Sequence, residues 1–326
     1  MFINTGKHTW PCFIYLYPKY ILMVNEASLV SVAMATYNGE KFIAAQLESI
    51  VHQTYRNIEI VITDDASADN TVQIIKQFQD KYNFIKLFIN AVNGGVTKTF
   101  ENSFENASGS FIAIADQDDI WQLNKIEILV SQLEVEDAVY SNSLLVDKNG
   151  QSLQKDFKSL MNLQSYYDGS PFLMGNCVPG HTIMMKTDFA RKILPIPQEI
   201  MFDRWISFCA AAGNGIKYVD MPLVHYRQHD NNAIGAGKSK NKKARKTKRE
   251  KFDIKLAELK VMNNAPIKNA KTKKILQQMV QLFTYSLSFK RSQFFFKNIN
   301  TLLVIKNKPM YRKIMYSLKM FFKPNY

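Results

Sequence analysis

Phe111-Ile-Ala-Ile-Ala-Asp116-Gln-Asp118-Asp119-Ile-Trp121 is the stretch around which the sequence is organised. Its first five residues are small or apolar and predict a buried strand, and three carboxylates follow within four positions. Because like charges this close repel one another, they need a counter-ion to stay ionised near a sheet edge. A divalent cation that prefers oxygen ligands, Mg²⁺ or Mn²⁺, would serve, and a nucleotide diphosphate would complete its coordination. The alternative is a solvated acidic turn that caps a helix beginning near Ile120.

The net charge of +14 is unevenly distributed over the 326 residues. Residues 1–237 contain 18 Lys and Arg against 25 Asp and Glu, whereas residues 238–326 contain 24 against 3. After Glu258 there is no acidic residue at all. An acidic head joined to a basic tail indicates that the tail meets an anionic partner, which would be a membrane surface or a nucleic acid.

Cysteine usage and hydropathy indicate a protein of a reducing compartment without a membrane span. The three cysteines at positions 12, 177 and 209 form no CxxC pair and no disulfide or metal framework. The longest apolar stretch, Trp10–Val24, is too short for a span, is interrupted by prolines, and lacks the cleavage site of a signal peptide. We therefore expect a cytoplasmic protein in which residues 1–27 are a peripheral N-terminal extension.

Strands and helices alternate four times between residues 29 and 134. The predicted strands are Leu29–Ala35, Asn57–Thr63, Phe84–Ile89 and Phe111–Ala115, and the predicted helices are Glu40–His52, Asp69–Tyr82, Thr97–Ala107 and Ile120–Glu134. This alternation predicts a Rossmann-like, mostly parallel α/β sheet, in which ligands bind outside the carboxyl ends of the strands. Polar clusters follow three of these ends, at Thr36-Tyr37-Asn38, Asp64-Asp65 and Asp116–Asp119. Three clusters at one edge indicate a ligand site more strongly than any one of them.

The second half of the chain is less regular. Further strands are predicted at His181–Lys186, Gly215–Asp220 and Leu223–Arg227, and a helix at Phe202–Ala212, which closes a domain over residues 28–237. Residues 238–251 carry nine basic residues in fourteen and predict a disordered linker or exposed loop. Residues 252–326 predict a basic helical tail. Its last helix, Pro309–Phe322, is amphipathic, with apolar residues on one side and lysine or arginine on the other.

Several residues near the strand ends are candidates for binding a nucleotide. Asp64 and Asp65 could accept hydrogen bonds from a nucleobase N–H or a ribose hydroxyl, and the alternative is helix capping, for which Asp69 is better placed. The turn at residues 36–38 could receive the base or the diphosphate through backbone groups. Lys98, after the Gly94-Gly95 turn, could reach a phosphate, although a lone glycine pair is more often a simple turn.

Transfer chemistry needs a second carboxylate, apart from the metal ligands, to take a proton from an attacking hydroxyl. Asp203 in Met201-Phe-Asp-Arg-Trp205 is the best candidate in the second half. The alternative is an aspartate that complements the helix dipole in the first turn and pairs with Arg204. The two tryptophans that follow carboxylates by two residues, Trp121 and Trp205, are core residues by default, and stacking on a sugar is the functional alternative.

Histidines 181, 225 and 229 lie in the same half of the chain. A lone histidine is more often structural than a ligand. His229 differs from the others because it closes the head domain just before the basic run.

The motifs at Ser31–Glu40, Asp64–Ser67 and Ala115–Trp121 resemble those of glycosyltransferase family 2, in its bacterial rhamnosyltransferase-like subgroup. Gly180-His181-Thr182, Asp203-Arg-Trp205 and Tyr226–Asn232 are similar to later motifs of that subgroup, so that the resemblance covers about residues 28–237. It implies a GT-A fold, a nucleotide-sugar donor, a Mg²⁺ or Mn²⁺ ion and inversion at the anomeric carbon.

The resemblance also implies roles for individual residues. Asp65 would contact the nucleoside, Asp116 the ribose or the metal, and Asp118 the metal, with His229 as a further metal or diphosphate contact. Asp203 would be the catalytic base. The remaining candidates are, for the donor, Thr36, Tyr37, Asn38, Asp64, Lys98 and Gln117 and, for lining the site or the acceptor, Asp119, Trp121, His181 and Trp205. Two positions depart from the pattern: Ala66 stands where glycine is common, and Phe202 where histidine or glutamate is common.

The leading hypothesis is a metal-dependent inverting glycosyltransferase that adds a sugar, such as rhamnose, galactose or glucose, from a dTDP- or UDP-linked donor to a lipid-linked or growing surface polysaccharide. The basic tail would hold it at the inner face of the plasma membrane, where each lysine or arginine contributes about 1 kcal/mol. Removal of residues 238–326 should then lower transfer to a lipid-linked acceptor while donor hydrolysis persists, whereas equal loss of both would indicate a structural role.

The two alternative functions are a nucleic-acid-binding protein and a nucleotide-sugar pyrophosphorylase. A nucleic-acid-binding protein could use the run at 238–251, although this run lacks aromatic residues and the acidic head has no role in such a protein. A nucleotide-sugar pyrophosphorylase would need a glycine-rich basic loop near the N-terminus, and residues 36–41 are not one.

Overall fold

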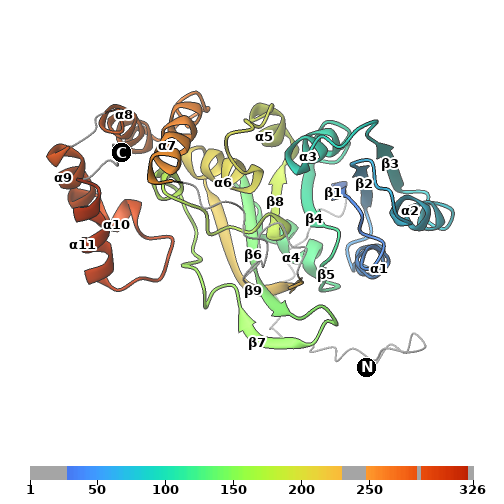
Figure 1. Ribbon diagram of the computed structural model, residues 1–326. Helices are drawn as coiled ribbons and strands as arrows, with labels where there is room; N and C mark the ends of the chain where they lie inside the picture. Colours follow the sequence, from blue (N-terminus) through green and yellow to red (C-terminus); the bar gives the residue numbers. More distant parts are fainter. Residues whose placement is uncertain (1–27, 230–246, 285–287, 322–326) are drawn as a thin grey trace.

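A nine-stranded mixed sheet runs through the protein in the computed structural model, which describes residues 28–229, 247–284 and 288–321 (Figure 1). The strand order is β3-β2-β1-β4-β8-β6-β9-β5, with β7 paired to β6. The strands are β1 (Val30–Thr36), β2 (Ile58–Asp64), β3 (Ile85–Ile89), β4 (Phe111–Asp116), β5 (Ile120–Trp121), β6 (Ala138–Val146), β7 (Ser152–Asp156), β8 (Ile183–Lys186) and β9 (Ile216–Arg227).

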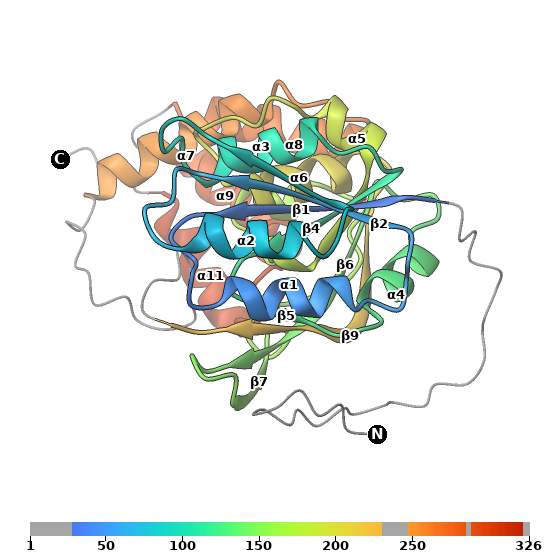
Figure 2. The ribbon, with the colours of Figure 1, turned by 90° about the vertical axis from the view of Figure 1, so that its right-hand side faces the viewer.

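The first four strands are parallel, as the alternation predicts. Helices α1 (Ile43–Val51) and α2 (Thr71–Gln79) cover one face of the sheet, and α3 (Val96–Glu105) covers the other (Figure 2). Neighbouring residues of β1 alternate between the two cores: Met34 packs with α1, whereas Ala33 packs with α3. Strands that are buried on both faces remove more apolar surface from water than strands with one solvated face. This burial stabilises the parallel half of the sheet.

The remaining strands are mixed in direction, and one prediction here is wrong. The chain after Asp119 does not enter a helix at Ile120 but forms β5, which pairs with Val224 and His225 of β9. Helix α4 (Lys125–Gln132) begins only four residues after Trp121. The two strands predicted at 215–227 are one strand, β9, whose register against β6 shifts near Pro222 because proline cannot donate to the ladder. Helices α5 (Thr187–Lys192) and α6 (Phe202–Ala212) follow β8, and short 3₁₀ turns η1 (Ser170–Leu173) and η2 (Gly180–Thr182) precede it.

The C-terminal helices share the core of the sheet domain. They are α7 (Lys248–Met262), α8 (Ala270–Leu282), α9 (Phe289–Lys297), α10 (Ile299–Leu302) and α11 (Met310–Lys319). Leu259, Met279 and Phe295 belong to the same apolar cluster as Phe208 of α6. Residues 247–251, predicted as linker, form the capping box and first turn of α7, with the Glu250 N–H donating to Thr247 Oγ1. The tail is therefore continuous with the domain rather than a separate appendage.

Within the described ranges, no helix is both long and apolar enough to span a bilayer. The N-terminal extension at 1–27, the basic run at 238–246 and the end of the last predicted helix lie outside the described residues.

Candidate active site

Three strand ends meet at one edge of the sheet, as their order in the sequence predicts. β1 lies between β2 and β4, and the register places Thr36 beside Asp64 and Ala35 beside Asp116. The Thr36 hydroxyl donates to Asp64 Oδ2 at 2.7 Å. The polar clusters that are far apart along the chain thus lie next to one another.

The turn after β1 is tied to the acidic loop by Gln117. The Tyr37 N–H donates to Gln117 Oε1 at 2.9 Å, and Gln117 Nε2 donates to the Tyr37 carbonyl at 3.0 Å. A Cβ at Gly39 would lie 2.2 Å from Gln117 Oε1, so a side chain at this position would displace Gln117 from these hydrogen bonds. Asn38 Oδ1 accepts the Ala68 N–H and joins the turn to the loop after β2. Gln117 therefore holds two of the three strand-end loops together.

A cavity of about 460 Å³ opens above this turn. Its lining includes five of the predicted site residues, Tyr37, Asn38, Gln117, Asp118 and His229. The Phe42 side chain forms part of the wall and stacks on the His229 ring, with centroids 4.9 Å apart. Predicted donor-binding and metal-binding residues therefore share one hollow.

The two aspartates after β2 have different surroundings. Asp64 is fully buried and accepts from the Thr36 hydroxyl, the Ser67 hydroxyl and the Ser67 N–H, so its oxygens shape the loop. Asp65 accepts from Asn90 Nδ2 and from the N–H groups of Gly94 and Gly95. Burial alone would raise the pKa of Asp65, but these donors hold its pKa below the usual value.

A second hollow of about 370 Å³ lies beside Asp65 and is lined by Asn90, Gly94 and Lys98 among others. The Lys98 ammonium forms an ion pair with Glu101 at 2.9 Å in this structure. Asn90 and Gly94 both donate to Asp65, and both also line this hollow next to the strand edge.

Ala66 shows the physical reason for a glycine at its position. Its φ is +62°, in the left-handed region that a Cβ disfavours. The strained residue turns the chain so that the Ser67 N–H and hydroxyl reach Asp64. The departure from the family pattern is accommodated at a cost in backbone strain.

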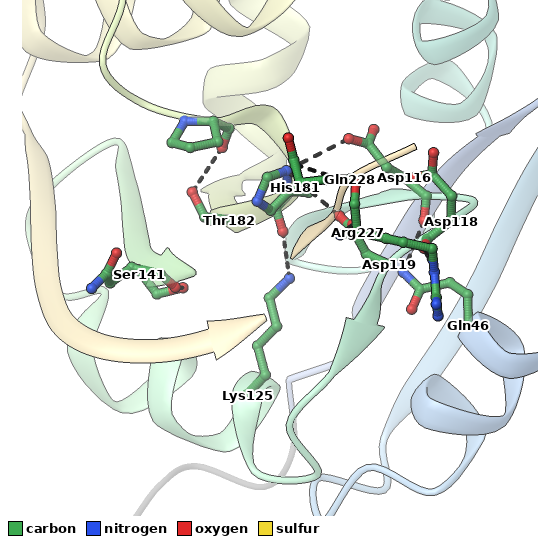
Figure 3. A network of polar contacts seen from close by, with 12 residues as sticks. Gln46, Asp116, Asp118, Asp119, Lys125, Ser141, His181, Thr182, Arg227 and Gln228 are labelled. Atoms are coloured by element: carbon green, nitrogen blue, oxygen red, sulfur yellow. Dashed lines mark hydrogen bonds and ion pairs between the residues drawn. The ribbon is translucent and has the colours of Figure 1, made fainter. Parts of the chain in front are cut away.

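The acidic loop after β4 lies against one side of His181, as Figure 3 shows. His181 Nδ1 lies 3.6 Å from Asp116 Oδ2 and 3.6 Å from Asp119 Oδ2. Asp119 is fully buried, and its Oδ1 accepts the Arg227 N–H at 3.0 Å. Burial, together with the carboxylates of Asp118 and Asp116, raises the pKa of Asp119 well above its usual value.

His181 comes to Asp116 through the pairing of two strands that are distant in sequence. β8 runs antiparallel to β4, with Ile112 beside Met185 and Ala113 beside Met184. Continued along the chain, this register brings position 181 opposite position 116. The sequence carries no signal for this register.

Asp118 faces a different partner. Its Oδ2 lies 2.8 Å from His229 Nε2, and its carbonyl oxygen accepts from Arg227 Nε at 2.8 Å. Arg227 also donates from Nη1 to the Lys148 carbonyl. Arg227 thus holds the backbone of Asp118 with its guanidinium and the carboxylate of Asp119 with its backbone N–H. No pattern in the sequence predicts this role for Arg227.

The carboxylates and histidines of this loop fit a divalent cation. Ligand atoms of Asp116, Asp119 and His181 all lie within 4.8 Å of one another. Asp119 Oδ2 is buried and has no hydrogen-bond partner among the described residues, which is costly unless a cation or another group fills the space. The predicted metal ligands are Asp116, Asp118 and His229, and this cluster shares only Asp116 with them. Its other two members, Asp119 and His181, are residues for which the sequence predicts a lining role.

Lys125 is buried beneath this loop, and no feature of the sequence indicates its role. Its side chain is fully buried, and Nζ donates to the His181 carbonyl at 2.7 Å and lies 3.3 Å from the centre of the Trp121 ring. Burial lowers the pKa of Lys125 well below its usual value, while the Asp119 and Asp116 carboxylates oppose this shift. The acidic loop therefore has a buried amine next to it.

Asp203 lies in the first turn of α6, against η2. A Cβ at Gly180 would lie 2.8 Å from the Phe202 ring and 3.5 Å from Asp203 Cβ, so glycine permits this close approach. Burial raises the pKa of Asp203 to about 7, with the Arg204 N–H opposing the shift and the nearby Asp116 carboxylate adding to it. Asp203 and the acidic loop therefore lie on the same side of the molecule.

Neighbours of Asp203 in sequence serve the core. The Arg204 guanidinium pairs with Glu258 of α7 at 2.7 Å and donates to the Phe172 and Leu173 carbonyls, so it does not form the ion pair with Asp203 that the structural alternative required. Phe202 packs against Phe100 of α3 in a tilted arrangement, with ring centroids 4.5 Å apart. Here an apolar residue precedes Asp203 because it fills the space between α3 and η2.

The two tryptophans are buried in the two cores. Trp205 Nε1 donates to the Ile193 carbonyl at 2.8 Å, and the Trp121 ring covers Lys125. In this structure both indoles pack in the interior, which agrees with the core-packing alternative rather than with stacking on a sugar.

The comparison with protein families decides what kind of domain carries this site. The model described as Glycosyl transferase family 2 matches residues 31–194, half of the chain, including the strand-end clusters and η2. The chain belongs to glycosyl transferase family 2. The protein is thus a glycosyltransferase, and the pyrophosphorylase alternative is set aside.

Two relatives of this family 2 glycosyltransferase are named for their donors. It is 33% identical over 218 residues to the dTDP-rhamnosyl transferase RfbG of Shigella flexneri, covering 62% of this chain and 74% of the relative. It is 37% identical over 123 residues to the UDP-Glc:alpha-D-GlcNAc-diphosphoundecaprenol beta-1,3-glucosyltransferase WfgD of Escherichia coli, covering 37% of this chain and 48% of the relative.

A solved structure of S. aureus TarS (residues 1–349) in complex with UDP-GlcNAc has the same fold. The TM-score is 0.56 at 19% sequence identity, over 90% of this chain and 80% of that chain. The GT-A fold expected from the resemblance is confirmed, and the C-terminal helices follow the sheet domain as expected.

Proposed function

We propose that this family 2 glycosyltransferase is metal-dependent and inverting, and that it moves a sugar from a dTDP- or UDP-linked donor to a lipid-linked or growing surface polysaccharide. The observation that carries the proposal is the position of Asp203 beside the acidic strand-end loop, with its pKa raised to about 7. A carboxylate with a pKa near the working pH is well suited to accept a proton and release it again.

The donor would occupy the cavity above the turn at residues 37–39 and the hollow beside Asp65. Asp65 would contact the nucleoside, with Asp64 and Thr36 holding its loop, and Tyr37, Asn38 and Gln117 would line the path of the diphosphate. Lys98 would have to leave Glu101 to reach a phosphate.

Mn²⁺ or Mg²⁺ would be held by Asp116 and Asp118, with His229, Asp119 and His181 as the other groups available at this edge. The bound ion would neutralise the charge that develops on the departing diphosphate. For Asp118 and His229 to bind a common ion, the direct contact between Oδ2 and Nε2 must open.

The proposed reaction is a single displacement. The acceptor hydroxyl oxygen forms a bond to the anomeric carbon from the side opposite the diphosphate, and the bond from that carbon to the diphosphate oxygen breaks. Asp203 takes the hydroxyl proton, and the nucleoside diphosphate leaves with the bonding electron pair. One displacement inverts the configuration at the anomeric carbon.

The relatives' names guide the choice of donor and acceptor. One is named for a dTDP-rhamnosyl donor, and the other for a UDP-glucose donor and a diphosphoundecaprenol acceptor. We infer by analogy a cytoplasmic enzyme that works at the inner membrane surface on a similar lipid-linked glycan.

A donor screen would test the proposal. The full chain is incubated with dTDP- and UDP-sugars and a diphosphoundecaprenol-linked sugar, with Mn²⁺, with Mg²⁺ or with EDTA, and products are detected by mass spectrometry. We expect transfer from one donor that stops in EDTA, and a product of inverted configuration by nuclear magnetic resonance. Transfer that is undiminished in EDTA, or a product of retained configuration, would contradict the proposal.

The structure changes how the role of the tail must be tested. Leu259, Met279 and Phe295 of the tail are buried in the domain core. Removal of residues 238–326 would expose this core, so that hydrolysis and transfer would fall together for structural reasons. Point substitutions on the outer surface are the appropriate test.

A further inference from the structure

Helix α11 carries five exposed apolar side chains on the side that faces away from the protein. Tyr311, Met315 and Leu318 are 61%, 51% and 48% exposed, and Met310 and Ile314 are exposed beside them. Their spacing of one, three and four residues places all five on one side of a helix. We call these five residues the α11 face.

The opposite side of the helix packs on the protein through polar contacts and through the Tyr316 ring, which lies against α9. Ser317 is fully buried, and its carbonyl accepts from Ser292 Oγ of α9 at 2.9 Å. Arg291 of α9, also fully buried, donates from Nε to the Met320 carbonyl at 2.6 Å. Two small serines allow the helices to approach closely, and the arginine fixes the C-terminal end of α11. The orientation with the apolar side outward is therefore built into the packing.

Basic residues flank the α11 face. Lys306 and Lys308 precede the helix, and Arg312 and Lys319 lie along one edge of the apolar stripe. All four side chains are exposed. The sequence has no acidic residue after Glu258. An apolar stripe bordered by cations is the pattern of a helix that lies in the plane of a membrane interface.

We propose that the α11 face docks this glycosyltransferase on an anionic lipid bilayer. Five apolar side chains on one side need an apolar phase, which a nucleic-acid backbone does not offer. A second copy of the chain would bring two basic borders together, and like charges across an interface oppose association. A bilayer of anionic lipid satisfies both the apolar stripe and its basic border.

This inference rests on the proposed reaction, in which a lipid-linked acceptor is presented at a membrane surface. Figure 1 shows α9 and α11 at one end of the molecule and α2 and β3 at the other, with β6 and β9 between them. A bilayer against α11 would therefore lie next to the C-terminal helices, and it would leave the strands with the proposed donor-binding residues clear of the lipid.

Vesicle flotation of the full chain without donor or acceptor tests the docking by itself. We expect the wild-type protein to float with vesicles of phosphatidylcholine and 30% phosphatidylglycerol and to bind pure phosphatidylcholine at least tenfold more weakly. The triple variant Tyr311→Ser, Met315→Ser, Leu318→Ser should lose at least tenfold in partitioning. The double variant Arg312→Gln, Lys319→Gln should lose more than tenfold on anionic vesicles, since each basic residue is worth about fivefold.

Val135→Ser, Leu153→Ser is the matched control, because both residues are exposed apolar side chains outside the C-terminal helices. It should float like the wild type. Equal flotation of the triple variant and the wild type would overturn the proposal. So would a wild type that stays unbound, that binds an oligonucleotide through the same residues, or that forms a dimer lost in the triple variant. Because no sugar is transferred in this assay, failure of the proposed reaction would leave its result unchanged.

Discussion

The acidic strand-end loop and the basic residues that flank the α11 face differ in sign, and they also differ in how their ionisable groups are surrounded. Asp119, Lys125 and His181 are buried, and the structure gives each a defined neighbour at a defined distance. Arg312 and Lys319 are exposed at the rim of an apolar stripe. A buried charge that loses its partner destabilises the protein, because its desolvation is no longer compensated. An exposed charge is solvated with or without a partner.

This difference indicates what each region contributes. Substitutions in the acidic loop should change chemistry or stability, because its charges cannot be satisfied by water. Substitutions on the α11 face should leave the fold unchanged and alter only its affinity for a surface. The two regions should therefore respond differently to substitution, and the largest difference is expected at the proposed catalytic residues.

Asp203→Asn and Asp118→Asn should each lower transfer by roughly 10²–10⁴-fold, because the first removes the proposed base and the second a proposed metal ligand. The control is Asp188→Asn, which changes another aspartate in the first turn of a helix, one that is exposed on α5. Initial rates with the identified donor would measure the effect. Retention of more than a tenth of the wild-type rate by Asp203→Asn would remove this residue from the role of base.

The pH profile should report the ionisation of Asp203. Its pKa is raised to about 7, and only the carboxylate can accept a proton, so kcat/KM should fall about tenfold per pH unit below 7 and level off above it. The residual activity of Asp203→Asn should lack this inflection.

The same shift predicts the effect of pH on stability. The folded-state pKa lies above the unfolded value, so folding favours the protonated form and stability is lost as pH rises from about 4 through 7. In EDTA, Asp203→Asn should therefore unfold at a higher temperature than the wild type at pH 8, and the gap should shrink toward pH 4. A gap independent of pH would contradict the shift.

Lys125→Met should destabilise the protein by about 1–3 kcal/mol, since the His181 carbonyl loses its buried donor. The acidic loop also loses the amine that opposes its negative charge when protonated, so added Mn²⁺ should raise the Tm of this variant more than that of the wild type. Thermal unfolding in EDTA and in Mn²⁺ would measure both. An equal Mn²⁺ shift in the two proteins would show that Lys125 does not neutralise the loop.

Ala66→Gly should stabilise the protein by about 1 kcal/mol, because glycine adopts the positive φ at this position without strain. Denaturant unfolding would measure the gain. Ala68→Gly is the matched control, since Ala68 lies in the same loop without a positive φ, and it should give no gain.

Arg312→Gln, Lys319→Gln should change the free energy of unfolding by no more than about 0.5 kcal/mol, as is usual for exposed positions. Its transfer to a water-soluble acceptor should equal that of the wild type. A large loss of stability would show that these charges belong to the fold, and the contrast between the two regions would fail.

The parallel half of the sheet and the edge at which the site forms could be predicted from the residues alone. Alternating strands and helices fix the crossovers, and polar residues directly after β1, β2 and β4 must come together because the ends of parallel strands share an edge. The importance of Asp203 could be inferred only as one of two equal alternatives, because a first-turn aspartate looks the same in either role.

Contacts between strands that are distant in sequence could be identified only in the folded protein. The antiparallel register of β4 and β8 brings His181 to Asp116, the pairing of β5 with β9 replaces the predicted helix at Ile120, and the burial of Lys125 depends on both. The tail shows the same limit, since its amphipathic pattern does not say which side of α11 faces the protein. That choice was made by Ser317 and Arg291, because local periodicity specifies a face while packing against a partner specifies where the face points.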